Sequence, residues 1–287
     1  YPLAFVAAKL ALGYSLLEIE NKVTKKTKAC FEPALDYVVV KVPRWDLQKF
    51  RNVNLEIGSE MKSVGEVMAI GRKFEEALQK ALRMLGTHFH GLTGNSVVFS
   101  DLDRELTHPT DKRVLAVVEA LKRGYTIDKI HDLSKIDKWF LYKIESVVEV
   151  EREMHMHTLG TLTTELLRRA KERGFSDHQI ADLLCEGGKC GNESSEDKML
   201  LVRKLRKRYG ILPVVKQIDT LAAEYPAETN YLYMTYNGTQ NDVVTMGDKK
   251  VVVLGSGTYR IGSSVEFDWC CVNTVKALRT KGYSAIM

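Results

Sequence analysis

Apolar residues between positions 101 and 209 recur every three or four positions, which is the spacing of amphipathic helices. The runs begin at residues that cap helices, such as Asp137, and two of them end at Gly124 and Gly174. We expect helices at 110–123, 126–133, 134 or 137 to 154, 163 or 164 to 174, 176–185 and 194 or 195 to 209. Such short helices with short connections predict a compact all-α domain, interrupted by a polar, mobile loop at 187–197.

The stretch before this region mixes helix and strand patterns. We expect helices at 1–12, 15–23 and 74–84, and strands at 35–42 and 62–70. Gly13 ends the first helix, Ser15 caps the second, and Pro43 closes the first strand. Two strands do not make a domain core by themselves, so the pattern predicts missing strand partners on the N-terminal side.

The C-terminal stretch has the pattern of an α/β nucleotide-type domain. An aromatic strand at 231–236 and a polar linker at 237–250 lead to a buried strand at 251–254, a glycine turn, a helix and a second strand. A parallel sheet needs several such units to cover both of its faces. We therefore expect a mainly α fold with incomplete α+β and α/β parts at its two ends, cut from the middle of a longer enzyme.

The glycine turn consists of Gly255, Gly257 and Gly262. Backbone N–H groups at the start of a helix favour anions. However, the spacing differs from the dinucleotide-binding G-x-G-x-x-G, and the lysine of a P-loop is absent. The turn therefore suits either a phosphate or close packing of the strand on the helix. Glu266 and Asp268 likewise suit either a ligand or the positive end of the helix dipole.

Composition and charge exclude several classes of protein. The chain of 287 residues is 45% apolar with a net charge of +5, which is typical of a globular protein. A basic run at 203–208 suits a polyanion or a solvated helix face. No aromatic residues interleave with it, so the helix face is favoured and we expect no nucleic acid partner. No apolar run is long enough to cross a membrane, so we expect no membrane partner.

Three pairs of cysteine or histidine residues have spacings that suggest metal or disulfide chemistry. Cys185 and Cys190, and likewise His88 and His90, lack further ligand residues nearby in the sequence. On a helix, the side chains of His155 and His157 would point about 200° apart, which does not suit one metal ion. We therefore expect free thiols, no metal site and no nucleophilic triad or dyad in this chain.

Longer motifs carry a resemblance to one family. They are YPLAFVAAKL at 1–10, FEPALDY at 31–37, KVPRWD at 41–46, MKSVGEVMAIGR at 61–72 and GSGTYRIGSSVEFDW at 255–269. In these stretches, and in their order, the chain resembles the central part of the large chain of carbamoyl phosphate synthetases. The last motif resembles the eukaryotic form of pyrimidine pathways more than the bacterial forms.

The resemblance implies a domain organisation. On the family's pattern, residues 1–82 are the C-terminal end of a first ATP-grasp domain that makes carboxyphosphate. Residues 83–210 are the helical oligomerisation domain, and residues 211–250 are a connection. Residues 251–287 begin the pre-ATP-grasp domain of the second half. This organisation agrees with the incomplete sheets expected from the pattern alone.

The resemblance also implies an activity for the parent protein. It is a ligase that joins bicarbonate to ammonia from glutamine at the expense of two ATP, with Mg²⁺ or Mn²⁺. The residues that hold ATP and metal lie outside this chain, so the chain alone is expected to be inactive. Its implied partners are the remaining synthetase domains, a glutaminase subunit or domain and further copies of itself. The implied compartment is the cytoplasm, or the mitochondrion for a urea-cycle parent.

Glutamates at positions that match Glu32 and Glu266 line an internal passage for carbamate in the family, and Arg260 is a further candidate. A closed passage suits a reactive intermediate that decomposes in water. Glu32 also precedes Pro33 in a turn, and Glu266 also suits a helix cap, so structural roles remain alternatives.

Three functions compete on this evidence. The chain is a connecting segment of a synthetase, a free-standing helical interaction module, or a small nucleotide-binding protein that uses 255–262. The unfinished sheet disfavours the third, because a ligand crevice needs neighbouring strands.

Overall fold

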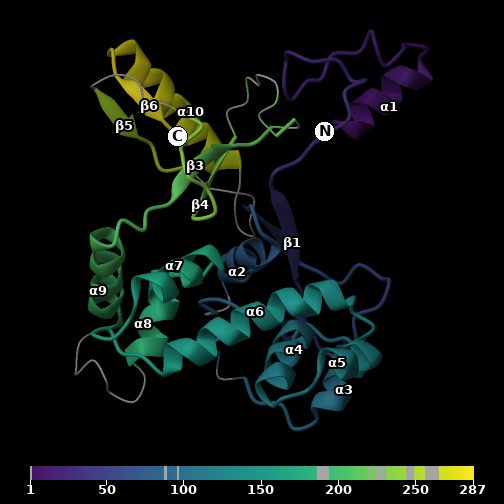
Figure 1. The fold of residues 1–287 in the computed structure, drawn as a ribbon. Coiled ribbons are helices and arrows are strands. Elements are labelled where there is room, and N and C mark those ends of the chain that lie inside the picture. The colour runs from purple at the N-terminus through teal and green to yellow at the C-terminus, as the bar shows by residue number, and fades with distance from the viewer. Residues whose placement is uncertain are drawn as a thin grey trace.

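A computed structural model describes residues 2–86, 89–95, 97–185, 194–219, 221–222, 224, 228, 231–243, 249–255 and 265–287. The helical region forms the body of the molecule, and α1 and α10 lie at two separate places beyond it (Figure 1). The helices of this body are α3 (Leu102–Thr107), α4 (Arg113–Lys122), α5 (Ile127–Ser134), α6 (Lys138–His155), α7 (Thr164–Glu172), α8 (Asp177–Cys185) and α9 (Ser195–Arg208). The predicted all-α region is therefore confirmed.

Local hydrogen bonds explain where these helices begin. The side chains of Thr126, Asp137, Thr163 and Ser194 each accept a hydrogen bond from a backbone N–H in the first turn of the following helix. The start expected at residue 110 is wrong by one turn, because α4 begins only at Arg113. Of the loop expected at 187–197, residues 187–193 lie outside the described part, and Ser195 already belongs to α9.

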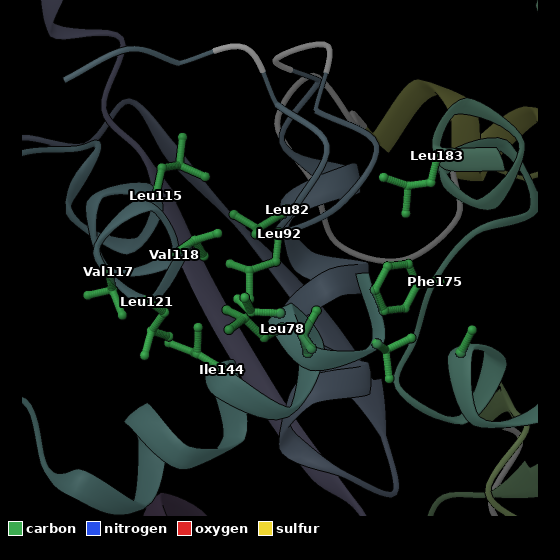
Figure 2. Packing of buried hydrophobic residues seen from close by; sticks show 14 of the residues in the cluster. Leu78, Leu82, Leu92, Leu115, Val117, Val118, Leu121, Ile144, Phe175 and Leu183 are labelled. Carbon is green, nitrogen blue, oxygen red and sulfur yellow. The ribbon is translucent and has the colours of Figure 1, made fainter. Parts of the chain in front are cut away.

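One hydrophobic core fills the helical body and continues to α2 (Phe74–Met84). Figure 2 shows side chains from α2, α4, α6 and α8 converging in it: Leu78, Leu82, Leu115, Val117, Val118, Leu121, Ile144 and Leu183. Each such leucine or isoleucine contributes about 1.5–3 kcal/mol when it is fully buried. The core therefore makes the helical body and α2 one packed unit.

Strands β1 (Val38–Arg44) and β2 (Gly65–Gly71) form an antiparallel pair that leads into α2. The first strand was expected to end before Pro43, but it runs one residue past it, with Pro43 opposite Glu66. A proline lacks the N–H of a ladder and is tolerated in an edge strand. In this two-stranded sheet every strand is an edge.

The N-terminal segment differs from the expectation. Helix α1 (Leu3–Ala11) is confirmed, but residues 15–23 form turns instead of a second helix. The Ser15 hydroxyl bonds the carboxylate of Glu18, which closes a single turn. A β-bridge from Glu20 to Lys28 then folds the segment back on itself. Propensity favoured a helix here, and this pairing across eight residues overrides it.

The connection contains a hairpin that was only half expected. Strand β4 (Leu232–Thr235) is confirmed, and it pairs in an antiparallel manner with β3 (Val214–Gln217), for which no strand was predicted. The C-terminal unit is confirmed as β5 (Lys250–Val252), α10 (Val265–Thr280) and β6 (Ser284–Ile286), with β5 and β6 parallel. Among the described helices, none is long and apolar enough to cross a membrane.

One cysteine prediction is wrong. Cys185, at the end of α8, is disulfide-bonded rather than a free thiol. Cys30, Cys270 and Cys271 are free, as expected.

Candidate functional site

A buried carboxylate marks the place where three parts of the chain meet. Glu76 lies in the first turn of α2, and only 1% of its surface is exposed. Helix α2 packs its apolar side on the core, and Glu76 is held beside β2 on one side and the β3–β4 hairpin on the other. A charge this deeply buried requires several hydrogen-bond donors around it.

Four donors surround the Glu76 carboxylate. Its Oε2 accepts from the backbone N–H of Arg72 at 3.1 Å, the Thr235 hydroxyl at 2.9 Å and the Asn237 amide at 2.9 Å. Its Oε1 accepts from the Lys80 ammonium at 2.7 Å. Thr235 ends β4 and Asn237 follows it, so one carboxylate joins α2 to a hairpin about 160 residues further along the chain.

Lys80 and Asn237 extend this contact to further segments. The Lys80 ammonium also donates to the carbonyls of Ile70 in β2 and Met234 in β4. The Asn237 amide also donates to the carbonyl of Glu172, the last residue of α7. Burial lowers the pKa of Lys80, and the Glu76 charge opposes that shift. We call Glu76, Lys80, Thr235 and Asn237 the junction cluster.

Helix α2 is tied a second time to the end of α7. The Gln79 amide donates to the carbonyl of Arg173, and the Arg83 guanidinium donates to the carbonyl of Gly174. The Arg173 guanidinium in turn donates to Glu75 at 2.7 Å. The Gln79 bond satisfies the carbonyl of the C-cap residue of α7, and together these bonds hold the C-terminal end of α7 against α2.

A buried ion cluster lies next to the junction cluster, at the meeting point of α7, α8 and α9. Asp177 at the start of α8 accepts from Lys171 at 2.7 Å and from Arg206 at 2.8 Å. The side chains of Lys171 and Arg206 also lie over the ring of Tyr236. Burial raises the pKa of the Asp177 carboxyl, but the two cations outweigh it and hold the pKa below its ordinary value.

The Lys171 ammonium gives the protein a pH-dependent stability. Burial lowers its pKa from 10.5 to about 8, with Asp177 acting in the opposite direction. Between these values the unfolded chain binds a proton that the folded chain does not, so stability rises with pH. We therefore expect the free energy of unfolding of the wild type, minus that of Lys171→Met, to increase by about 1–2 kcal/mol from about pH 8 to about pH 10.

Urea unfolding followed by circular dichroism across this pH range measures the Lys171 effect. Tyr37 and Tyr236 have pKa values raised by burial, and both are present in the wild type and the variant. The contribution of Tyr37 cancels in the comparison, and Tyr236→Phe is introduced into both proteins because Lys171 lies over the Tyr236 ring. Parallel curves for the two proteins would contradict the prediction.

A cavity in the described part of the chain has a volume of about 650 Å³. It lies between β1, α2 and α4 and is lined mainly by apolar side chains. Two arginines that line it are already engaged in hydrogen bonds. Arg44 donates to Asp46 and to the carbonyl of Leu85, and Arg113 donates to the carbonyls of Leu106 and Ser134. The cavity is therefore an apolar space, and its lining residues are not arranged for acid–base or nucleophilic catalysis.

The structure describes only some of the residues singled out from the sequence. Glu32 is exposed in the segment before β1. The backbone of Glu266 belongs to α10, but its side chain lies outside the described part, as do Arg260, Gly257 and Gly262. Gly255 follows β5, and a Cβ added there would lie 3.5 Å from Met287 Cγ and 3.8 Å from Cys271 Sγ. Gly255 therefore packs against the C-terminal unit, and the roles of the other residues remain predictions.

Sequence reasoning missed the junction cluster. Glu76 and Lys80 stand four residues apart on a helix, which is the commonest arrangement of exposed ion pairs. The sequence alone offers no sign that this pair is buried, because the covering atoms come from Thr235 and Asn237. The one indication in the sequence was Thr235, a polar residue near the end of the aromatic strand predicted at 231–236.

The described residues do not make an ATP–Mg²⁺ site. Their one group of His, Cys, Asp or Glu at metal-ligand distances is His90, His178 and Asp182. Mg²⁺ prefers an octahedron of oxygen ligands, which this set does not supply. We therefore derive no phosphoryl-transfer step for this part of the chain.

Comparisons with known proteins assign the two main parts of the chain. Residues 66–210 match the family described as carbamoyl-phosphate synthetase large chain, oligomerisation domain. Residues 247–287 match the carbamoyl phosphate synthase preATP-grasp domain.

Similar relatives align with the whole chain. The mitochondrial arginine-specific carbamoyl phosphate synthase large chain of Neurospora crassa is 56% identical over 100% of this chain and 24% of its own length. The arginine-specific large chain of Eremothecium gossypii is 55% identical over 100% of this chain and 25% of its own. Multifunctional protein pyr1-3 of Dictyostelium discoideum is 52% identical over 100% of this chain and 12% of its own. The chain thus spans about a quarter or less of these relatives.

Proposed function

Because the chain belongs to the carbamoyl phosphate synthase large-chain family, we propose that it is the connector between the two synthetase halves of such an enzyme. The observation that carries this proposal is the junction cluster. It bonds β2 and α2, which precede the helical body, to β4 and Asn237, which follow it. A segment that joins two catalytic halves needs such a contact, because it fixes the entry and exit of the helical body relative to each other.

The proposal extends to the domain organisation. Residues 1–82 then belong to a first ATP-grasp domain, and residues 83–210 form the oligomerisation domain. Residues 211–250 form the connection, and residues 251–287 begin the second half. The incomplete two-stranded sheets β1–β2 and β5–β6 support the assignment of the two ends to larger domains.

The parent's chemistry is proposed on the family alone. It converts bicarbonate, two ATP and ammonia from glutamine to carbamoyl phosphate. ATP and Mg²⁺ or Mn²⁺ act in domains outside this chain, and the chain alone is inactive. A glutaminase subunit or domain, the other synthetase domains and further copies of the chain are the proposed partners. The relatives are named either for arginine-specific synthesis or as multifunctional proteins. The parent is therefore proposed to serve either arginine or pyrimidine synthesis.

Glu32 and Glu266 are proposed to line the passage for carbamate, with Arg260 as a further candidate. One contact supports this for Glu32. Two residues after it, Ala34 forms a parallel β-bridge with Leu221, which places the exposed Glu32 beside the connection. The connection leads along the chain to α10, which carries Glu266. Carbamate passing from the first half to the second would then meet both carboxylates.

Substitution in the full-length parent enzyme tests this passage. We expect Glu32→Ala and Glu266→Ala each to lower carbamoyl phosphate synthesis at least about tenfold while sparing bicarbonate-dependent ATP hydrolysis, because the intermediate escapes to water. Glu56→Ala is the matched control, since Glu56 is also an exposed glutamate of the N-terminal part. Equal loss of both activities would indicate misfolding, and full synthesis in both variants would exclude the passage role.

A further inference from the structure

Two histidines and an aspartate meet at the side of α8 that faces the segment after α2. His178 and Asp182 stand four residues apart on α8, and His178 Nδ1 lies 2.9 Å from Asp182 Oδ2. His90 comes from the segment between α2 and α3, and its ring stacks on that of His178 with centroids 3.8 Å apart. One ligand atom from each residue lies within 4.8 Å of the other two. The segments that supply them are almost ninety residues apart in the chain.

Both ring nitrogens of His178 have a polar partner, which fixes the orientation of the ring. One of them, Nε2, lies 3.0 Å from the hydroxyl of Ser195 at the start of α9. In the tautomer in which Nε2–H donates to that hydroxyl, the Nδ1 lone pair faces the Asp182 carboxylate, and a metal ion bound by both would replace the Nδ1–H to Oδ2 hydrogen bond of the other tautomer. Hydrogen bonding of the second nitrogen is the usual way in which a protein orients a metal-binding histidine.

We propose that His90, His178 and Asp182 bind a divalent transition metal ion, with Zn²⁺ as the best match. Two imidazole nitrogens and a carboxylate oxygen form a donor set suited to zinc, and a water completes four-coordination. Tetrahedral zinc holds its ligand atoms about 3.3 Å apart. The three ligand atoms lie within 4.8 Å of one another, but the stacked rings hold the lone pairs of His90 and His178 in nearly parallel planes, so binding requires His90 to rotate out of the stack. His90 and Asp182 are exposed, so their side chains are able to move.

The proposed ion has a structural consequence. It would cross-link the segment between α2 and α3 to α8, close to the place where Gln179 of α8 donates to Gln79 of α2 and to the carbonyl of Thr93. The ion would therefore strengthen a contact that already exists inside the helical body. This role differs from the metal of the parent's ATP chemistry, which the proposed function places in other domains.

Zinc titration of the purified 287-residue chain tests the site. Isothermal titration calorimetry is expected to give one tight ion per chain. We expect His90→Ala, His178→Ala and Asp182→Asn each to weaken the affinity at least about tenfold, as loss of a ligand does at least as much as loss of a supporting bond. With Co²⁺ as a probe, the wild type is expected to show the visible absorption of a four-coordinate ion, and the variants to lose it.

His157→Ala is the matched control, because His157 is half-buried like His178 but lies elsewhere, with its Nδ1 3.1 Å from the carbonyl of Thr161. This variant is expected to bind zinc like the wild type. Circular dichroism in the presence of a chelator is expected to show the same helical content and cooperative thermal unfolding for all variants, which shows that weaker binding does not come from misfolding. Tight zinc binding that persists in the double variant His90→Ala/His178→Ala, or no tight binding by the wild type, would overturn the proposal.

Discussion

Replacing Glu76 by alanine is expected to lower the free energy of unfolding by about 3–5 kcal/mol, the usual cost of breaking a buried ion pair. The carboxylate accepts from four donors, and Lys80, Thr235 and Asn237 lose their shared partner together. Lys80 retains two carbonyls, but its buried charge is no longer balanced. Urea unfolding of the full chain, followed by circular dichroism, measures this effect.

A matched pair on α4 provides the control for Glu76. Glu119 and Arg123 have the same four-residue spacing and a bond of 2.7 Å, but they lie at the surface of the helical body, with side chains 28% and 45% exposed. Glu119→Ala is expected to cost about 0.3–0.5 kcal/mol. Equal losses in the two variants would show that the Glu76 carboxylate does not act as a buried tie.

Gly174→Ala is expected to cost about 2–4 kcal/mol, because overpacking adds to backbone strain at this position. Gly174 follows the C-terminal end of α7 with a φ of +88°, where a side chain is strained. A Cβ added there would lie 2.8 Å from Glu76 Cα and 3.0 Å from the Glu76 carbonyl. Both are backbone atoms, so relief requires α7 to move away from α2.

Gly124→Ala is the control that separates the steric clash with α2 from the backbone strain at positive φ. Gly124 ends α4 in the same manner, with a φ of +83°, but an added Cβ meets nothing within 4 Å. We expect this variant to cost only about 1 kcal/mol, the strain term alone. Thermal and urea unfolding of both variants give the comparison, and a Gly174→Ala loss no greater than that of Gly124→Ala would mean that α2 and α7 are not in close contact.

Local signals made most of the helical body predictable. Asp137 and Thr163 begin helices because their side chains accept first-turn N–H groups, and Gly174 ends one because it tolerates positive φ. These interactions span three or four residues, so they are visible in the sequence. The same reasoning gave α2 with its observed bounds.

Contacts between distant residues were not predictable from the sequence. Residues 15–23 lack a helix because Glu20 pairs with Lys28, and β3 forms because β4 pairs with it. Glu76 reads as a surface glutamate until Thr235 and Asn237 cover it. The resemblance to the family suggested the proposed connector role, but it directed attention to Glu32 and Glu266 rather than to the junction cluster.

Hydrogen exchange of the β3–β4 hairpin tests most directly whether the junction cluster couples the connection to the helical body. The comparison is between the wild type and Glu76→Gln, which keeps the shape but replaces one acceptor oxygen by a donor group. We predict that amides of 214–217 and 232–235 exchange at least about tenfold faster in the variant, while those of α4 stay unchanged. Unchanged exchange in the hairpin would mean that the connection is held by other contacts, and would contradict the connector account.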